Sequence, residues 1–298
     1  MGKSHKLDHK SFRVSGAKKF RLKDHDPGHT GGFKDKSEAR EALIEDVSAL
    51  AEAQELLWAS REYSVIIIFQ GMDAAGKDGT IKHVMSGVNP QGVDVLSFKA
   101  PTDEERLHHF LWRPSKAVPA RGRIAIFNRS YYEEVLVVRV HPELLEQQWL
   151  SRAQRTDNLD KVWSHRFEQI NMFERILTNN GTIILKFFLH LSKSEQRERF
   201  LERLTNPEKY WKFSVSDYRE RQHWDAYQAA FEDMLRETST DWAPWYVIPA
   251  DKKWFMRACV ADIIAARIGE LDLNYPKVSD EQCARLEEVR KELEKEGD

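Results

Sequence analysis

Cysteine is scarce in this sequence, and long apolar runs are absent from it. Among 298 residues only Cys259 and Cys283 are cysteines, which argues against a disulfide framework and against a cysteine-built zinc site. The longest apolar run, Val65–Phe69, is far shorter than the ~20 residues that a membrane-spanning helix needs. The N-terminus is basic and polar and lacks the apolar stretch of a signal peptide. We therefore expect a soluble, cytoplasmic protein with reduced cysteines.

Net charge is also low, but it is unevenly distributed. The formal net charge is −2. Residues 1–36 hold ten Lys/Arg against four Asp/Glu, while the remainder holds 36 against 44. We interpret residues 1–36 as a basic N-terminal arm and residues 37–298 as one domain. The arm could bind a polyanion or pack on an acidic neighbour. The second interpretation is the simpler one, and we expect neither nucleic acid nor a membrane among the partners.

From residue 37 onwards, short β-branched runs alternate with longer stretches of helical periodicity. The predicted strands are residues 64–70, 94–98, 123–127, 182–189 and 245–248. The predicted helices are residues 37–60, 157–179, 192–204, 216–238, 252–268 and 279–296, with a further helix beginning at 80–85. This alternation predicts a three-layer α/β domain with a mostly parallel five-stranded sheet and helices on both faces.

A glycine-rich loop follows the first predicted strand and has the G-x-x-x-x-G-K pattern of a phosphate-binding loop. It runs Gly71-Met-Asp-Ala-Ala-Gly-Lys-Asp-Gly-Thr80 and leads into a helix. Glycines let backbone N–H groups converge on phosphate, the helix N-terminus adds partial positive charge, and Lys77 adds a full one. The alternative is a strand–turn–helix corner without a ligand. The residues expected to bind phosphate are Gly71, Ala74, Ala75, Gly76, Lys77, Asp78, Gly79 and Thr80, with Lys82 in the helix that follows.

The loop departs from the usual pattern in one position. Asp78 follows Lys77, where phosphate-loop enzymes normally carry the Ser or Thr that binds Mg²⁺. Asp73, inside the loop, offers a carboxylate oxygen, which is a ligand type that Mg²⁺ prefers. We therefore predict that Asp73 binds the metal or a water on it. The alternative is an Asx turn that shapes the loop.

The third predicted strand ends in Asn128, followed by Arg129. An apolar strand that ends in a carboxylate beside a phosphate loop is the Walker B arrangement, and here a neutral side chain takes that place. Arg129 could bind a transferring phosphate through two parallel hydrogen bonds. Alternatively, Asn128 caps the strand and Arg129 pairs with a structural carboxylate.

Residues 192–214 combine cations with an apolar helix face marked by Phe200 and Leu204. Cations beside such a face are unusual for a purely solvated surface. A lid that closes over phosphates would explain them. The alternative is a surface of i,i+4 salt bridges. The cations that we expect to bind phosphate here are Lys193, Arg199, Arg203, Lys209 and Lys212.

Together these motifs resemble the second polyphosphate kinase family, in order, from about residue 37 to 270. The resemblance implies a three-layer P-loop kinase fold, related to thymidylate kinases, with a helical lid at about 192–214. It also implies Mg²⁺-dependent transfer of phosphoryl groups between inorganic polyphosphate and nucleotides. The segments that carry it are residues 71–80, Ser97-Phe-Lys-Ala-Pro101, Phe110-Leu-Trp-Arg113, Phe127-Asn-Arg-Ser-Tyr-Tyr-Glu-Glu134 and Trp211-Lys-Phe-Ser214.

Carried over position by position, the resemblance implies catalytic roles for Asp73, Lys77, Arg129 and Arg199. Lys99 and Arg113 lie in matching segments, and we expect them to bind nucleotide or phosphate. Many family members carry Asp at position 128. The version with Asn128 looks like the subgroup associated with both AMP and ADP as acceptors. We therefore expect AMP to be converted to ADP and ADP to ATP, reversibly.

The chemistry that the residues suggest agrees with this expectation. A nucleotide phosphate oxygen is already anionic, so no general base is needed, and no triad-like set or H-x-x-E-H motif is present in the sequence. We expect adenine nucleotides as substrates, with guanine nucleotides as a second class, and a homodimer or homotetramer. The main alternative is a nucleotide kinase that uses ATP as donor. A GTPase-like switch lacks an N-K-x-D motif here, and a nucleic-acid-binding module rests on the basic arm alone.

Overall fold

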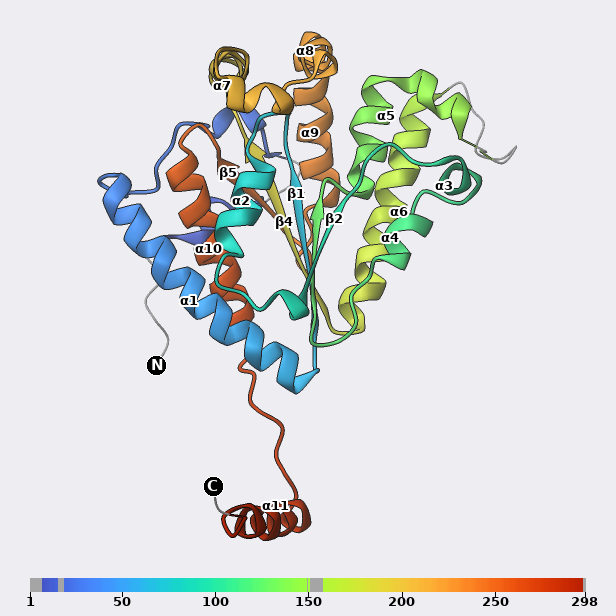
Figure 1. Cartoon of the computed structure of the whole chain (residues 1–298). Helices are drawn as coiled ribbons and strands as arrows, with labels where there is room; N and C mark the ends of the chain where they lie inside the picture. Colours follow the sequence, from blue (N-terminus) through green and yellow to red (C-terminus); the bar gives the residue numbers. More distant parts are fainter. Residues whose placement is uncertain (1–6, 16–18, 149, 151–157, 297–298) are drawn as a thin grey trace.

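The structure is a computed structural model that describes residues 7–15, 19–148, 150 and 158–296. A central sheet lies between two groups of helices, so this part of the chain has three layers (Figure 1). One face of the sheet is covered by α1 (Lys36–Ser60), α2 (Lys77–Val84) and α10 (Lys253–Gly269). The other face is covered by α5 (Val137–Val140), α6 (Leu159–Asn179) and α9 (Trp224–Thr238). The predicted three-layer α/β architecture is confirmed.

The sheet has five parallel strands in the order β2-β3-β1-β4-β5. All five were predicted, each within one residue of its observed bounds. The strands are β1 (Ser64–Gln70), β2 (Val93–Ser97), β3 (Ile124–Asn128), β4 (Thr182–His190) and β5 (Trp245–Pro249). Because β1 is central and the chain passes to either side of it, the loops after β1, β3 and β4 meet at one edge. Ligands of such sheets bind at this carboxyl edge.

β1 is buried along its whole length, which explains its continuous apolar run. Val65 and Ile67 belong to the cluster under α1 and α10, while Ile66 and Ile68 belong to the cluster under α6 and α9. Burial of each such side chain is worth about 1.5–3 kcal/mol. The strand therefore provides a rigid support for the loop that begins at Gly71.

The predicted helices are present, with two differences. α2 begins at Lys77 rather than Thr80, because Gly76 adopts φ 107° and acts as the N-cap. The stretch 216–238 is divided into α8 (Val215–Glu220), a 3₁₀ turn η8 (Arg221–His223) and α9. Helical periodicity continues through that division, so the pattern does not show it. The predicted start of α6 at residue 157 lies outside the described residues.

The segment between β2 and α6 contains short helices that the sequence pattern did not reveal. Each is four to six residues long, too short for a periodic pattern to be visible. They are α3 (Asp103–Leu107), α4 (Trp112–Lys116), η5 (Tyr131–Val135), α5 and η6 (Pro142–Gln147). The remaining 3₁₀ turns of the described chain are η1 (His9–Ser11), η3 (Leu22–Asp24), η4 (Pro90–Gly92) and η7 (Pro207–Lys212), and η7 follows the lid helix α7 (Lys193–Thr205).

The described part of the N-terminal arm lies against the β5 edge of the sheet. Val14 donates its N–H to the Trp245 carbonyl at 2.9 Å, and Val247 donates to the Phe12 carbonyl at 2.8 Å. Phe12 and Val14 are buried. The arm also contacts acidic groups of the body, for example His9 with Asp262 at 3.0 Å. This packing covers a strand edge that would otherwise be exposed.

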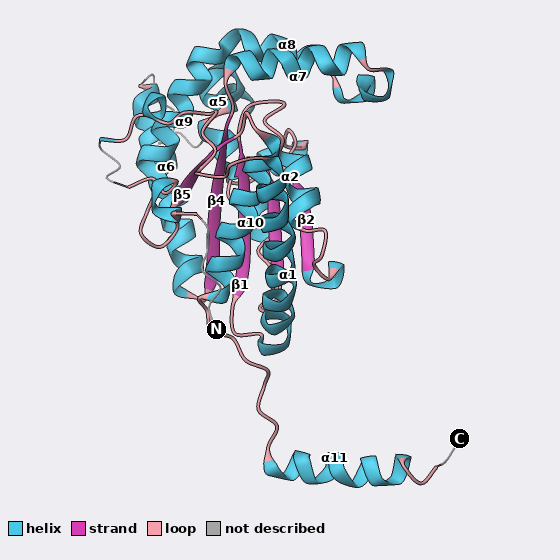
Figure 2. Ribbon diagram, turned by 90° about the vertical axis from the view of Figure 1, so that its left-hand side faces the viewer, coloured by secondary structure: helices cyan, strands magenta, loops and turns pink. Residues whose placement is uncertain are grey.

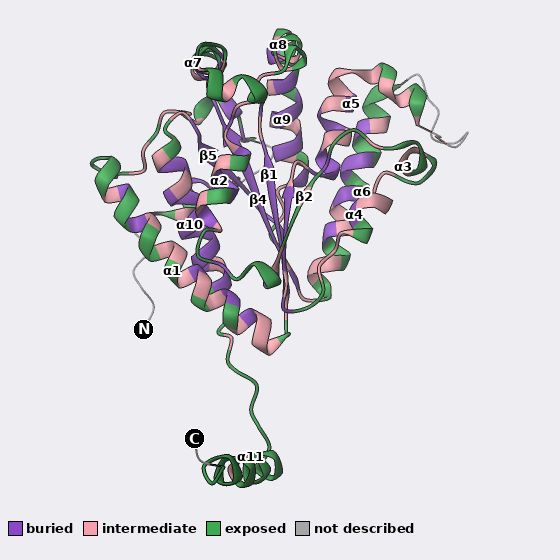
Figure 3. Cartoon of the chain, in the orientation of Figure 1, coloured by how far each residue is buried: buried purple, intermediate pink, exposed green. Residues whose placement is uncertain are grey.

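The last helix, α11 (Asp280–Leu293), begins with the predicted capping box of Ser279 and Gln282. It stands away from the three-layer body at the end of a long connector (Figure 2). Nearly all of its residues are exposed, in contrast to the largely buried strands β1, β3, β4 and β5 (Figure 3). α11 therefore contributes nothing to the core described above.

Candidate active site

The phosphate loop turns sharply at the end of β1. Gly71 has φ 153°, Ala74 has φ 64° and Gly76 has φ 107°. A Cβ at Gly71 would lie 2.8 Å from the Leu189 carbonyl oxygen, so only glycine allows this approach between the loop and β4. Within the described residues, the N–H groups of Asp73, Ala74 and Gly76 donate to no protein acceptor. The loop therefore presents free donors at the N-terminus of α2, as an anion cradle requires.

Lys77 folds back over this loop. Its Nζ donates to the carbonyls of Gly71 at 2.7 Å and Met72 at 3.3 Å. Burial lowers the pKa of Lys77, and the nearby Arg129 guanidinium lowers it further, while Asp73 and Glu133 oppose the shift. A phosphate bound in the loop would add negative charge beside the Lys77 ammonium group and so favour its charged form.

Arg129 and Asp73 form an ion pair at the mouth of the loop. The Arg129 Nη2 donates to Asp73 Oδ1 at 2.7 Å, and Glu133 lies 4.0 Å from the same guanidinium. Arg129 itself has φ 61°, held by its N–H bond to the Phe69 carbonyl at 3.1 Å. Glu133 raises the pKa of Arg129, and burial raises the pKa of Glu133. The structure thus brings together Asp73, Lys77 and Arg129, as the sequence predicted for the centre of the site.

Asn128 and Asp78 are also in direct contact. The Asn128 amide donates to Asp78 Oδ1 at 2.5 Å, linking the end of β3 to the first turn of α2. A carboxylate in the first helical turn is favourable to the helix dipole. Nearby, the Thr80 hydroxyl donates to the Gly76 carbonyl at 3.0 Å. Among the predicted ligands farther along α2, Lys82 is exposed. Phosphate binding by these side chains remains a prediction.

Arg199, on the lid helix α7, is buried beneath the loop. Its Nη1 donates to the carbonyls of Ala74 and Ala75 at 2.9 and 3.0 Å, and its Nη2 donates to those of Ala250 and Asp251 at 2.6 and 3.1 Å. Its Nε donates to a Glu195 carboxylate oxygen at 2.9 Å. All five N–H donors are therefore used by the protein. In this arrangement Arg199 holds the loop backbone, and its catalytic role remains a prediction.

The other predicted lid cations lie along α7 and η7, and most contact protein groups. Arg203 donates to the Lys212 carbonyl at 2.9 Å, and Lys209 pairs with Glu202. Lys193 lies over Trp224, and Lys212 lies over the exposed Trp211. α7 and η7 project above the carboxyl edge of the sheet (Figures 1 and 2). The predicted lid thus lies above the loop, and its movement remains a prediction.

A cavity of about 840 Å³ opens beside Arg129, past the carboxyl ends of β2 and β3. Lys99 and Arg113 line it as predicted ligands, and Arg113 lies over the Phe98 ring while donating to Glu105 at 3.0 Å. Phe110, Glu133 and Glu134, from segments that carry the family resemblance, also line it. Residues that the sequence analysis did not single out line it as well, among them Val138, Arg166 and Gln169.

Arg166 is the clearest of these omissions. It is 4% exposed on the inner face of α6, donates to the Glu134 carboxylate at 3.0 Å, and lies near the Phe110 ring. Its position between the buried Trp163 and Phe167, on an apolar helix face, is the signal that could have identified it.

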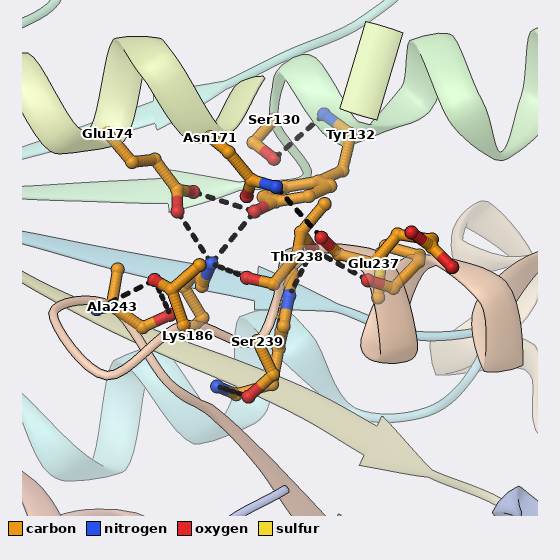
Figure 4. Close-up of polar contacts among 12 residues, drawn as sticks. Ser130, Tyr132, Asn171, Glu174, Lys186, Glu237, Thr238, Ser239 and Ala243 are labelled. Atoms are coloured by element: carbon orange, nitrogen blue, oxygen red, sulfur yellow. Dashed lines mark hydrogen bonds and ion pairs between the residues drawn. The ribbon is translucent and has the colours of Figure 1, made fainter. Parts of the chain in front are cut away.

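Below the segment after β3 lies a buried polar network that the sequence did not reveal (Figure 4). Lys186 of β4, fully buried, donates to Glu174 at 2.6 Å and to the hydroxyl of Tyr132 at 2.9 Å. Both Tyr131 and Tyr132 donate to the other Glu174 oxygen. Burial lowers the pKa of Lys186, and the Glu174 carboxylate opposes that shift. The network anchors the turn that carries Arg129 to the sheet and to α6.

The residues present suit a metal that is shared with substrate. Within the described residues, no group of three or more His, Cys, Asp or Glu is arranged to hold a metal ion. Mg²⁺ in phosphate-transfer sites is usually bound by one or two carboxylates together with substrate phosphates. Asp73, half-buried at the mouth of the loop, fits such a site.

In the described chain, no helix has the length and apolar character to cross a membrane.

Comparisons with known proteins match polyphosphate kinases or phosphotransferases that use polyphosphate. The family model for Polyphosphate kinase 2 matches residues 33–274. The ADP-polyphosphate phosphotransferase of Rhodopseudomonas palustris is 46% identical over 97% of this chain and 99% of its own length. The AMP/ADP-polyphosphate phosphotransferase of Meiothermus ruber is 48% identical over 90% of this chain and 96% of its own. The crystal structure of Polyphosphate Kinase 2 from Arthrobacter aurescens superposes with a TM-score of 0.84 at 40% identity, covering 94% of this chain and 95% of that one.

Proposed function

The chain belongs to the polyphosphate kinase 2 family, and we propose that it transfers phosphoryl groups between inorganic polyphosphate and both AMP and ADP. The observation that carries this proposal is the position of Arg129. This residue pairs with Asp73 of the phosphate loop and also lines the 840 Å³ cavity. A phosphate chain on the loop and a nucleotide in the cavity would therefore meet at one guanidinium.

Each part of the site suits one substrate. The loop offers free N–H donors and the Lys77 ammonium group. These groups can bind a phosphate whatever the phosphate is attached to. The cavity is large enough for a nucleotide, since ligand pockets typically measure about 300–1,000 Å³. Its wall combines aromatic rings such as Phe98 and Phe110 with the cations Lys99 and Arg113. This mixture suits a base and its sugar phosphate.

The chemistry requires positioning and charge neutralisation rather than a base. An anionic oxygen of the nucleotide attacks a phosphorus of polyphosphate, and the shortened chain leaves as an anion. Lys77 and the loop N–H groups stabilise the charge that spreads over the transferred group. As the substrates bind, the Arg129 guanidinium leaves the Asp73 carboxylate and pairs with a phosphate. Asp73 would hold Mg²⁺ together with the substrate phosphates, and the bound metal would supply further charge neutralisation. One phosphoanhydride replaces another, so the reaction is reversible.

Use of both acceptors is supported by Asn128 and by the name of the relative from Meiothermus ruber, which is described as acting on AMP and ADP. Asn128 adds no negative charge at the end of β3, so the phosphates of either nucleotide meet less repulsion there. We propose adenine nucleotides as the main class, with guanine nucleotides as a second class, and an oligomeric enzyme.

The test is to incubate the purified protein, free of adenylate kinase, with Mg²⁺, polyphosphate and either AMP or ADP, and to separate the nucleotides. We expect ADP and then ATP from AMP, and ATP from ADP. Formation of product with ATP as donor and none with polyphosphate would overturn the assignment. Robust conversion of ADP without any conversion of AMP would overturn the dual acceptor alone.

A further inference from the structure

The C-terminal helix α11 packs on no other element in the part of the chain that the structure describes. It lies beyond the body in two perpendicular views, joined by a connector whose residues are mostly exposed (Figures 1 and 2). None of its described residues belongs to either hydrophobic cluster. The segment that matches the family model ends at residue 274, before α11 begins.

The helix nevertheless carries an apolar stripe. Leu286, Val289 and Leu293 are 61%, 51% and 61% exposed, and Cys283 extends the same face by one turn. A helix of 14 residues is marginally stable in water by itself. A stripe of this spacing is typical of a helix that packs on another helix.

Leu286 and Val289, at the centre of the stripe, are related by symmetry about the point between Glu287 and Glu288. If two copies of α11 pair in antiparallel orientation around that point, Leu286 of each copy faces Val289 of the other. Leu293 then faces the first turns of the other helix, at Gln282 and Cys283. The same surface serves on both sides, which is the requirement for a two-fold interface.

The charges beside the stripe favour that orientation. In antiparallel pairs the positions that flank one side of the seam face each other, so Arg285 of each helix lies beside Glu292 of the other. In a parallel pair, Arg285 would lie beside Arg290 of the other helix, and like charges would repel. Arg285 is 74% exposed, so its contact with Glu281 in its own helix is a weak surface pair.

We infer that α11 is a self-association element that pairs in antiparallel orientation with α11 of a second copy of this chain. A seam between two 14-residue helices is short, whereas a standard stable interface buries ~1,200 Å² or more, so we expect weak association. The association through α11 is therefore concentration-dependent, and it is independent of phosphate transfer because α11 lies far from the loop (Figure 1).

The first test compares full-length variants by sedimentation over a range of concentrations. Leu286→Glu places a charge in the seam, and Ala284→Glu places the same charge on the outer face of the helix. We expect Leu286→Glu to weaken the concentration-dependent association by at least tenfold and Ala284→Glu to leave it unchanged. Polyphosphate kinetics of both variants should match those of the parent. Equal association of the parent and Leu286→Glu would overturn the inference.

The second test determines the orientation by disulfide formation in a Cys283→Ser background. A chain with Gln282→Cys is mixed with a chain with Leu293→Cys, and mixed disulfides are expected. Leu293→Cys alone should not cross-link, because an offset of 11 residues at 1.5 Å per residue separates the two cysteines by about 16 Å. Disulfides require Cα atoms within about 7 Å. Efficient cross-linking of Leu293→Cys alone, without mixed disulfides, would overturn the antiparallel arrangement.

Discussion

The two sides of the phosphate loop are held by arginines in opposite ways. On the lid side, the Arg199 side chain is 5% exposed and all its donors bind protein acceptors, four of them backbone carbonyls. On the β3 side, the Arg129 side chain is 42% exposed and its closest charged partner is the Asp73 carboxylate. The first arginine supports the backbone of the loop, whereas the second presents a cation that can exchange its partner.

This difference also constrains the lid. Gln196 donates to the Asp73 carbonyl at 2.9 Å, so the first two turns of α7 are tied to the loop at both Gln196 and Arg199. Movement at these positions would break several buried hydrogen bonds. We therefore expect any closure to involve residues beyond Arg199, where Lys209 and Lys212 lie on the exposed η7 turn.

This difference predicts that replacing Arg199 mainly lowers stability, whereas replacing Arg129 mainly lowers turnover. Arg199→Ala leaves four carbonyls without their donor and should lower the free energy of unfolding by about 3–5 kcal/mol. Arg129→Ala should leave the unfolding free energy within about 1 kcal/mol of the parent and lower kcat by about 100-fold. Urea denaturation and steady-state kinetics measure the two effects. Equal destabilisation by both substitutions would contradict the proposed difference between the two arginines.

We expect Lys77 to act together with Arg129 in phosphate transfer, although the Lys77 side chain is buried. Lys77→Ala should lower kcat by at least about 100-fold, because the charge of a preorganised cation is lost from the transferring phosphate. Lys277→Ala, in the exposed connector before α11, is the control and should change kcat little. Near-parent turnover by a folded Lys77→Ala protein would remove Lys77 from the site.

The loop side of this comparison could be predicted from the sequence, because its residues are consecutive. Ten adjacent residues, from Gly71 to Thr80, form the cradle, and the strand before them has a pattern of its own. Arg129 was predicted for a similar reason, since it directly follows a recognisable strand.

The cavity and the role of Arg199 could not be predicted in this way. The cavity assembles side chains from Phe98 to Gln169, and most of them lie on loops or short helices without a visible periodicity, while only those of α6 lie on a helix that the sequence pattern revealed. Arg199 has the same local pattern as a surface arginine, and only the tertiary packing of α7 on the loop buries it. Lys186 is a similar case, because its partner Glu174 lies on a different element.

The lid side should also be more sensitive to acid. His190 ends β4 just before the lid, and burial lowers its pKa to about 4. Between pH 6.5 and 4 the unfolded chain binds a proton at this residue that the folded chain does not bind, so stability falls as pH falls. From pH 6.5 to 5 we expect a loss of about 1.6 kcal/mol, because the slope approaches about 1.4 kcal/mol per pH unit only once the unfolded histidine is mostly protonated. His190→Gln should remove this part of the loss, measured by urea denaturation at each pH. An identical pH dependence in the variant would assign the acid sensitivity elsewhere.

The smallest expected effect concerns the contact between Asn128 and Asp78, next to Arg129. Asn128→Asp places a second carboxylate against Asp78 at hydrogen-bond distance, which raises the pKa of the pair and repels phosphate. We expect a decrease of several-fold in turnover and a changed ratio of the AMP and ADP rates, measured with polyphosphate as donor. Unchanged rates would show that charge at this position does not influence the acceptors.

A double substitution separates the two explanations of such a change. Asn128→Asp with Asp78→Asn restores an amide–carboxylate contact but moves the negative charge from α2 to the end of β3. If the neutral residue at position 128 is what allows both acceptors, the ratio of AMP to ADP rates stays altered in the double variant. If only the contact matters, because it sets the position of Arg129 relative to the loop, the double variant recovers both the rates and their ratio. The first outcome would place acceptor choice in the charge at the end of β3, and the second would place it in the geometry of Arg129.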